Sequence, residues 1–291
     1  MSPKIKILAT GAGGMLGGDV IKELSEKFEV FPTDLPELDV RNKEAINRWM
    51  GKIKPDYVLH MAAITDLDLC EENPELADAV NHIGTLNVAE ACEKTGTSII
   101  YISTSGIFSG RKKSPYSEND KPIPQNAYGK TKYLGELAVE KTLPSECRLI
   151  LRAGWLFGGG KKDIKFVGKI YKLVHRLDKL TAVNDIYGSP NYSVDIGKLI
   201  DYLITNKVNG IYHASNEGCV TRFDIAEEIV RLAGVDCRVE PVPATDFPTR
   251  APRPPMEAMT NKKLEKLGYK MRGWKEALAE YIDRLKCELE Y

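Results

Sequence analysis

The sequence lacks a surplus of charge of either sign. Its 291 residues hold 41 Lys plus Arg and 41 Asp plus Glu, so the formal net charge is zero. Nucleic-acid-binding domains usually carry a basic surplus, so we expect no nucleic-acid partner. The chain also lacks an apolar run of 18 residues, which a membrane-spanning helix needs. No signal-peptide core follows Met1, and we therefore expect a cytoplasmic protein without a membrane segment.

Cysteine and histidine are too sparse to indicate a disulfide framework or a metal site. The six cysteines form no C-x-x-C pair, and the four histidines show no ligand spacing. A chain of this length can bury enough surface to fold without such links. We expect reduced thiols and structural or surface histidines, with no metal-ligating residues, and a metal requirement stays open.

Strand and helix patterns alternate through the first half of the chain. The strand candidates are residues 5–9, a segment that begins at Val30, and residues 57–61, 98–103 and 148–153. The helix candidates are a segment through Val20 and Leu24, and residues 42–53, 74–94 and 127–141. This alternation predicts an α/β fold with a doubly wound parallel sheet, the Rossmann arrangement.

The second half is less regular. Its helix candidates are a segment from Phe166 to Val174 and residues 194–203, 222–233 and 274–289. Residues 241–255 hold six prolines, which predicts an extended loop there. We expect a dinucleotide-binding domain over residues 1–155. Residues 156–291 are then mainly a smaller substrate-binding domain, with some helices returning to pack on the Rossmann sheet.

A glycine-rich loop follows the first predicted strand and opens the first helix. Glycines permit a tight turn there, and amides at a helix N-terminus can hold a pyrophosphate. The loop therefore predicts a dinucleotide site that includes Gly11, Gly13, Gly14, Met15, Leu16 and Gly17.

Asp34 lies at the end of the second predicted strand, 23 residues after Gly11. A carboxylate there can bond both hydroxyls of an adenosine ribose and would repel the 2′-phosphate of NADP. No basic residue follows before Arg41. We therefore expect NADH to be preferred, with NADPH as the other possible cofactor. Asp39 and Val40 are weaker candidates, which could flank the adenine.

Tyr128 and Lys132 are four residues apart on a predicted helix and so share one face. An ammonium near a phenol lowers the pKa of the tyrosine, which would let Tyr128 exchange a proton with a carbonyl or alcohol oxygen. The pair follows the fourth predicted strand and the loop ending Ser103-Thr104-Ser105. Thr104 or Ser103 could add a hydrogen bond to that oxygen.

Together these motifs resemble the extended short-chain dehydrogenase/reductases, through T-G-x-x-G-x-x-G at residues 10–17 and Y-x-x-x-K at residues 128–132. Over nearly the whole chain the sequence is similar to the dTDP-4-dehydrorhamnose reductase family. The further matching segments are residues 62–68, 128–132, 152–158, 187–192 and 253–254. That family reduces the 4-keto group of a nucleotide-linked deoxysugar with a nicotinamide cofactor.

The resemblance implies a role for each matching residue. Tyr128 would donate the proton, Lys132 would hold the nicotinamide ribose, and Thr104 would complete a catalytic triad. Trp155 would face the sugar, and Arg253 would neutralise a substrate phosphate. The same resemblance adds Ala62, Ala63 and Thr65 to the cofactor site and Ser105 to the substrate site.

The chain departs from the family after the fourth strand. The family usually has S-T-D-Y-V-F, whereas Ser105 and Gly106 stand here in place of the Asp and Tyr. Glu257 also stands where the last family motif has a serine. We expect a roomier sugar pocket, and the nucleotide and the sugar stay open.

Two other functions remain open on this sequence. One is a nucleotide-sugar 4-epimerase, which would oxidise and re-reduce one carbon and keep its cofactor. The other is a non-catalytic dinucleotide-binding subunit that resembles the regulatory beta subunit of methionine adenosyltransferase. The oligomeric state is open as well, with a homodimer as our expectation.

Overall fold

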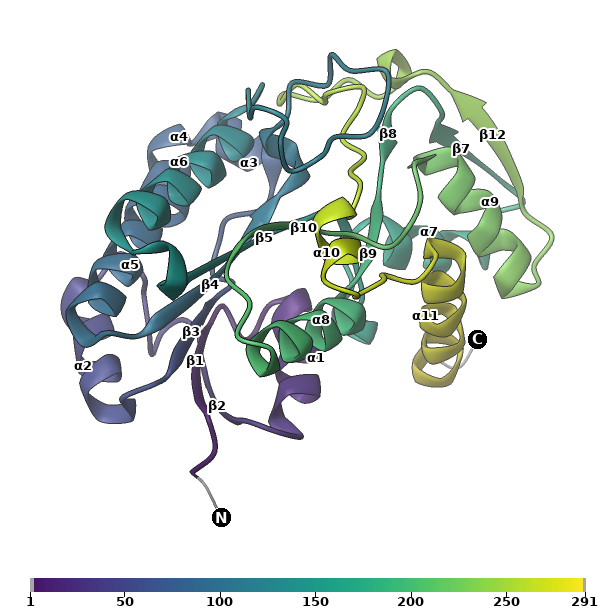
Figure 1. The fold of residues 1–291 in the computed structure, drawn as a ribbon. Coiled ribbons are helices and arrows are strands. Elements are labelled where there is room, and N and C mark those ends of the chain that lie inside the picture. Colours follow the sequence, from purple (N-terminus) through teal and green to yellow (C-terminus); the bar gives the residue numbers. More distant parts are fainter. Residues whose placement is uncertain (1–2, 290–291) are drawn as a thin grey trace.

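A six-stranded parallel sheet forms the centre of the larger lobe. The computed structural model describes residues 3–289, and Figure 1 shows the sheet between two layers of helices. The strand order is β10-β5-β4-β3-β1-β2, and each adjacent pair is parallel. The strands are β1 (Lys6–Thr10), β2 (Glu29–Thr33), β3 (Tyr57–His60), β4 (Ser98–Thr104), β5 (Arg148–Ala153) and β10 (Gly210–Ala214).

Helices cover both faces of this sheet, which confirms the doubly wound prediction. On one face lie α1 (Met15–Ser25) and α8 (Ser193–Thr205), whose apolar residues share a core with alternate residues of β1. On the other lie α2 (Lys43–Ile53), α5 (Gly84–Thr95) and α6 (Ala127–Thr142). The predicted cap Asn42 begins α2, since its side chain accepts a hydrogen bond from the Ala45 amide at 3.0 Å.

The residue 74–94 helix of the sequence analysis is built from three consecutive pieces. They are α4 (Pro74–Asp78), a π-helical turn (Ala79–Ile83) and α5. Such turns interrupt α-helices often at functional sites. A short helix that the sequence did not suggest, α3 (Leu67–Glu72), precedes them.

The larger lobe takes elements from beyond residue 155. The helix α8 packs against α1, as the expected return of helices to the sheet requires. The strand β10 also joins the sheet, beside β5, and was not foreseen. Its five residues follow a turn and carry no clear alternation of apolar and polar side chains. The sheet therefore does not end with the first 155 residues.

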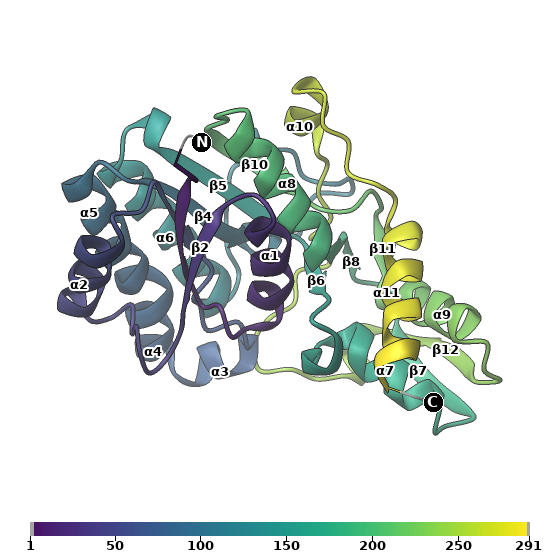
Figure 2. The ribbon, with the colours of Figure 1, turned by 90° about the horizontal axis from the view of Figure 1, so that it is seen from below.

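A smaller lobe lies beside the carboxyl ends of the sheet strands (Figure 2). Its helices are α7 (Phe166–Val174), α9 (Arg222–Ala233) and α11 (Trp274–Leu289), whereas α10 (Lys262–Lys266) packs beside β10 on the larger lobe. The core of the smaller lobe joins apolar side chains of α7, α9 and α11. Three two-stranded pairs complete it: β6 (Trp155–Phe157) with β9 (Pro190–Tyr192), β7 (Lys179–Val183) with β12 (Arg238–Val242), and β8 (Tyr187–Gly188) with β11 (Val220–Thr221).

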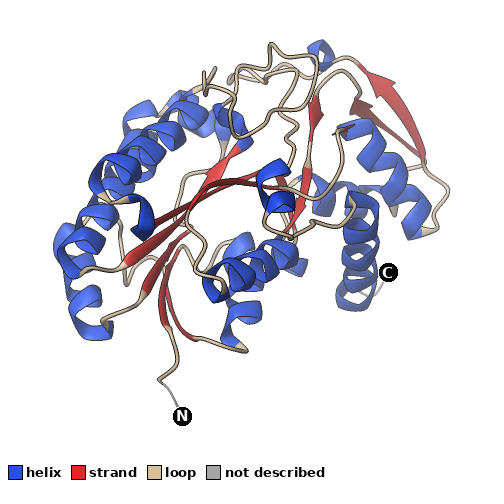
Figure 3. Cartoon of the chain, viewed as in Figure 1, coloured by secondary structure: helices blue, strands red, loops and turns tan. Residues whose placement is uncertain are grey.

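The proline-rich segment is extended after β12, apart from one short 3₁₀ turn (Ala244–Asp246), and Figure 3 shows it as loop. It is tied to α3 because Asp68 accepts hydrogen bonds from the Ala251 amide at 2.9 Å and from Arg253 at 3.1 Å. No helix within residues 3–289 is both long enough and apolar enough to cross a bilayer.

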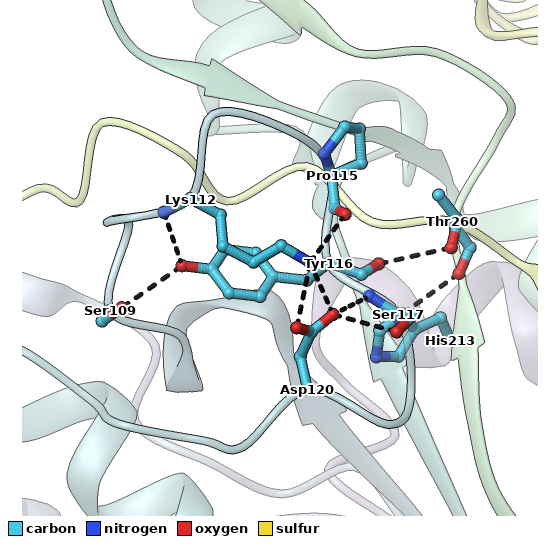
Figure 4. A network of polar contacts seen from close by, with 8 residues as sticks. All are labelled: Ser109, Lys112, Pro115, Tyr116, Ser117, Asp120, His213 and Thr260. Atoms are coloured by element: carbon cyan, nitrogen blue, oxygen red, sulfur yellow. Dashed lines mark hydrogen bonds and ion pairs between the residues drawn. The ribbon is translucent and has the colours of Figure 1, made fainter.

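A polar network fixes the loop between β4 and α6 to Thr260, just after the proline-rich segment (Figure 4). Lys112 forms an ion pair with Asp120 at 2.8 Å and lies over the ring of Tyr116. The Tyr116 carbonyl accepts a hydrogen bond from the Thr260 amide at 2.8 Å. The Thr260 carbonyl in turn lies 3.1 Å from Nδ1 of buried His213 on β10. Two segments far apart in the sequence are thereby held together beside the sheet.

Candidate active site

A single cleft of about 1470 Å³ runs along the carboxyl ends of the sheet strands and between the lobes. The strand order reverses at β1, which lies between β2 and β3. In a doubly wound fold ligands usually bind at the carboxyl ends of the strands at this point. Every candidate from the sequence lines this cleft. They are Gly11, Gly13, Gly14, Met15, Leu16, Gly17, Asp34, Asp39, Val40, Ala62, Ala63, Thr65, Thr104, Ser105, Tyr128, Lys132, Trp155 and Arg253.

The glycine loop connects β1 to α1 by the tight turn that its residues permit. Gly11 has a φ of +70°, and a Cβ there would lie 2.6 Å from the Ala62 amide nitrogen. A Cβ at Gly17 would lie 2.6 Å from the Ala12 carbonyl oxygen. Gly14 begins α1 without a side-chain cap. The helix therefore presents backbone amides to the cleft, where an anion can accept their hydrogen bonds.

Asp34 lies directly after β2 and against the glycine loop. Its Oδ2 accepts a hydrogen bond from the Gly13 amide at 2.6 Å, and its Oδ1 accepts one from the Leu35 amide at 2.8 Å. The carboxylate is thus fixed at the edge of the cleft, where the sequence analysis placed an adenosine ribose.

Arg41, the first basic residue after Asp34, forms an ion pair with Asp39. The guanidinium donates to both carboxylate oxygens of Asp39, with its closest contact at 2.6 Å. The hydrogen bond from Arg41 lowers the pKa of Asp39 below its usual value. Arg41 also lines the cleft, but its charge is already paired there.

Thr104 and Tyr128 lie together at the wall of the cleft, since a Cβ at Gly106 would lie 3.4 Å from Oγ1 of Thr104 and 3.6 Å from the ring of Tyr128. Asn126 begins α6 by accepting a hydrogen bond from the Gly129 amide at 2.8 Å, which sets the orientation of the helix that carries Tyr128. Burial raises the pKa of Tyr128 to about 12, and Thr104 opposes that rise. The tyrosine is therefore protonated at neutral pH.

Lys132 does not lower the pKa of Tyr128 in this structure, although the sequence had led us to expect that it would. Its Nζ donates to the carbonyl oxygen of Ile102 at 2.7 Å and lies 4.1 Å from the ring centroid of Tyr101. Burial lowers the pKa of Lys132 to about 7, against an opposing effect of Glu136. The expected lowering of the Tyr128 pKa by this ammonium is wrong for this structure, because burial determines both values.

Asn81 was not among the candidates, yet it holds the wall of the cleft in place. It lies in the π-helical turn, and its side chain accepts from the Ile64 amide at 2.8 Å and donates to the Ile64 carbonyl at 3.0 Å. It also donates to Thr131 on α6 at 3.2 Å. One asparagine among many gives no sequence signal, since only the fold brings these segments together.

Trp155 is more enclosed than expected for a residue that faces a sugar. Its indole N–H donates to Oε2 of Glu257 at 2.8 Å. The guanidinium carbon of Arg222 lies 3.8 Å from the centroid of the indole ring. A Cβ at Gly188 would lie 2.2 Å from the ring, so the backbone there is also in contact. The polar groups that this part of the wall offers come from Arg222 and Glu257.

Arg222 was missed by the sequence analysis, and Glu257 was noted only as a departure. Both line the cleft together with Arg253. Burial lowers the pKa of Arg222 to about 10, with Glu257 opposing and Arg253 adding to that shift. Burial raises the pKa of Glu257, which Trp155 and the two arginines oppose. The departure from the family motif at Glu257 was a sequence signal for a changed site. Arg222 gave no such signal, because in the sequence it is only the residue after the helix cap Thr221.

The two lobes touch across the cleft through Lys165. Its Nζ donates to Oγ1 of Thr65 at 3.1 Å, and burial lowers its pKa.

Ser105 is buried, and a Cβ at Gly106 would lie 3.6 Å from the ring of Tyr128. The position that the family fills with an aromatic residue is thus next to Tyr128. Within residues 3–289, no group of three or more His, Cys, Asp or Glu side chains could hold a metal ion.

A family model, the RmlD substrate binding domain, matches residues 5–287. The chain is 33% identical to a dTDP-4-dehydrorhamnose reductase from Mycolicibacterium smegmatis, with 95% of this chain and 85% of the relative covered. The chain therefore belongs to the RmlD substrate binding domain family.

Solved structures agree with this assignment. A dTDP-4-dehydrorhamnose reductase from Clostridium acetobutylicum is 40% identical with a TM-score of 0.93, over 97% of this chain and 100% of that one. One from Bacillus anthracis, solved with NADP, is 33% identical with a TM-score of 0.92, over 96% and 99%. A UDP-glucose 4-epimerase from Thermotoga maritima, at 21% identity and a TM-score of 0.85, shares the fold alone.

Proposed function

We propose that this member of the RmlD substrate binding domain family reduces the 4-keto group of a dTDP-linked deoxysugar with a nicotinamide cofactor. The observation that carries this function is that Thr104, Tyr128 and Lys132 line the same cleft as the glycine loop. Relatives named as dTDP-4-dehydrorhamnose and dTDP-4-keto-6-deoxy-D-glucose reductases match the chain nearly end to end.

The roles of the residues follow from this geometry. Tyr128, protonated at neutral pH, donates its proton to the keto oxygen as the carbonyl becomes an alcohol. Thr104 orients that hydroxyl, and Lys132 holds the ribose next to the nicotinamide. The nicotinamide, when bound, supplies the hydride that adds to C4. Arg253 neutralises part of the substrate diphosphate, which crosses the cleft toward the smaller lobe.

The glycine loop and Asp34 hold the adenosine half of the cofactor. We propose that NADH is preferred, because the Asp34 carboxylate is fixed beside Gly13 and Arg41 is already paired with Asp39. A 2′-phosphate would meet the charge of Asp34 without a free basic partner from Arg41. The six cysteines are unpaired, which supports a cytoplasmic location.

The test is oxidation of NADH and of NADPH by the purified protein with a panel of nucleotide-linked 4-keto sugars. We expect turnover with at least one dTDP-linked 6-deoxy-4-keto hexose and an alcohol as product. Interconversion of 4-epimers without net oxidation of cofactor would favour the epimerase. Binding of cofactor without turnover of any sugar would favour the non-catalytic subunit.

A further inference from the structure

Arg222 and Glu257 lie on rigid parts of the smaller lobe. The Glu257 amide donates to the Tyr187 carbonyl at 2.7 Å, and the Tyr187 amide donates to the Pro255 carbonyl at 2.9 Å. Arg222 is the first residue of α9, which Thr221 and Asp224 begin with reciprocal hydrogen bonds. Both side chains are therefore presented to the cleft from fixed backbone.

Arg222 has unused hydrogen-bond capacity. Its guanidinium lies over the rings of Trp155 and Phe166, at 3.8 and 4.7 Å from their centroids. No hydrogen bond or ion pair joins it to another residue within 3–289, although it lines the cleft. A guanidinium carries five N–H donors, and a partly desolvated one without partners is costly unless a ligand supplies acceptors.

Glu257 has the complementary capacity. Its Oε2 accepts from Trp155, while Oε1 accepts no hydrogen bond from the described part of the chain. Arg222 and Glu257 attract each other, yet their nitrogen and oxygen atoms are not close enough for an ion pair. Arg222 therefore has unused donors and Glu257 an unused acceptor along the same cleft.

We propose that Arg222 and Glu257 together recognise one hydroxyl of the substrate sugar, which accepts a hydrogen bond from Arg222 and donates one to Glu257. A hydroxyl suits this pair because it both donates and accepts. An ammonium group has no lone pair to accept a hydrogen bond from Arg222, and a carboxylate has no hydrogen to donate to Glu257. The pair thus selects an uncharged, hydroxylated sugar over an amino or acidic one. This inference rests on the proposed function, since it takes the ligand to be a nucleotide sugar.

The experiment compares kcat/KM for a dTDP-linked 6-deoxy-4-keto hexose with its 2-deoxy, 3-deoxy and 3-amino analogues. In the unmodified enzyme we expect kcat/KM for one of the two monodeoxy analogues to be roughly 10- to 100-fold lower than for the parent sugar. This is the usual effect of losing hydrogen bonds to charged groups. The 3-amino analogue should be at least about tenfold poorer than the parent.

Two variants separate recognition from structure. Glu257→Gln keeps a carbonyl oxygen for the Trp155 N–H but replaces an acceptor with a donor, so the monodeoxy effect should shrink to about threefold or less. Trp155→Phe removes the contact that holds Glu257 but keeps the carboxylate, so the effect should largely persist. Equal use of all analogues by the unmodified enzyme, or an undiminished effect in Glu257→Gln, would overturn the proposal.

Failure of the proposed function would look different, since no 4-keto sugar would then be reduced. In that case calorimetric binding of dTDP-glucose and its monodeoxy analogues makes the same comparison. We expect the same loss of affinity for one analogue and its disappearance in Glu257→Gln. Equal binding of all of them, or no binding at all, would count against the hydroxyl-recognition pair.

Discussion

Lys132 donates its Nζ hydrogen bond to the carbonyl oxygen of Ile102, at 2.7 Å, from a side chain that is only 3% exposed. The lysine four residues after Tyr128 is therefore held inside the protein by strand β4. A buried ammonium opposes folding, so charged Lys132 lowers the stability of the protein. The role that we propose for Lys132 is in the reaction.

Replacement of Lys132 with methionine should stabilise the protein and abolish reduction. Burial lowers the pKa of Lys132 from 10.5 to about 7, so the folded state binds fewer protons than the unfolded state between these values. The charged lysine thus destabilises most below about pH 7, and the effect fades as the pH approaches 10.5. We expect a gain of a few kcal/mol at about pH 6 and a smaller gain at about pH 9.

Urea denaturation of the two proteins at both pH values measures this difference. A Lys132→Met protein that is less stable than the unmodified one at about pH 6 would show that the hydrogen bond to Ile102 outweighs the cost of burial.

Replacement of Asp34 with alanine should shift the cofactor preference toward NADPH. The unmodified protein should use NADH better, and the variant should narrow the gap in kcat/KM by roughly tenfold, since one like charge near the 2′-phosphate is removed. Arg41→Gln is the matched control, because its charge is paired with Asp39 and should matter less. Equal or better use of NADPH by the unmodified protein would refute this preference.

Replacement of Gly129 with alanine should destabilise the protein, whereas replacement of Gly106 with alanine should not. A Cβ at Gly106 would lie 3.6 Å from the Tyr128 ring, an ordinary contact, whereas one at Gly129 would lie 2.1 Å from the Gly106 carbonyl oxygen. We expect Gly106→Ala to fold normally and Gly129→Ala to lose about 1–3 kcal/mol or more through overpacking. Thermal denaturation compares them, and equal stability of the two variants would mean that α6 can shift away from the loop.

Arg253→Gln should raise KM for the nucleotide sugar by roughly tenfold, the effect of losing one charge-assisted hydrogen bond to phosphate. Arg250→Gln provides the control, since Arg250 pairs with Glu72 as Arg253 pairs with Asp68, but does not line the cleft. Steady-state kinetics with saturating cofactor distinguishes the two. Similar KM values for both variants would remove Arg253 from the diphosphate site.

The sequence predicted the elements whose signals are local. The glycine loop, the Tyr128–Lys132 spacing and the alternation of strands and helices each lie within one short segment, and the helices at residues 222–233 and 274–289 were predicted with their observed bounds. Pairings over long separations were not predictable. The strand β10, the enclosure of Trp155 by Arg222 and Glu257, and the contact of Lys132 with Ile102 all depend on how distant segments meet.

The central claim is that Tyr128 donates the proton in a nicotinamide-dependent reduction, and Tyr128→Phe tests it most directly. The change keeps the ring and removes only the phenolic hydroxyl, which lines the cleft beside Thr104. With a dTDP-linked 6-deoxy-4-keto hexose, the turnover rate should fall by about 100-fold or more, while cofactor affinity should change by less than about threefold. Turnover by Tyr128→Phe at the rate of the unmodified enzyme would contradict the account.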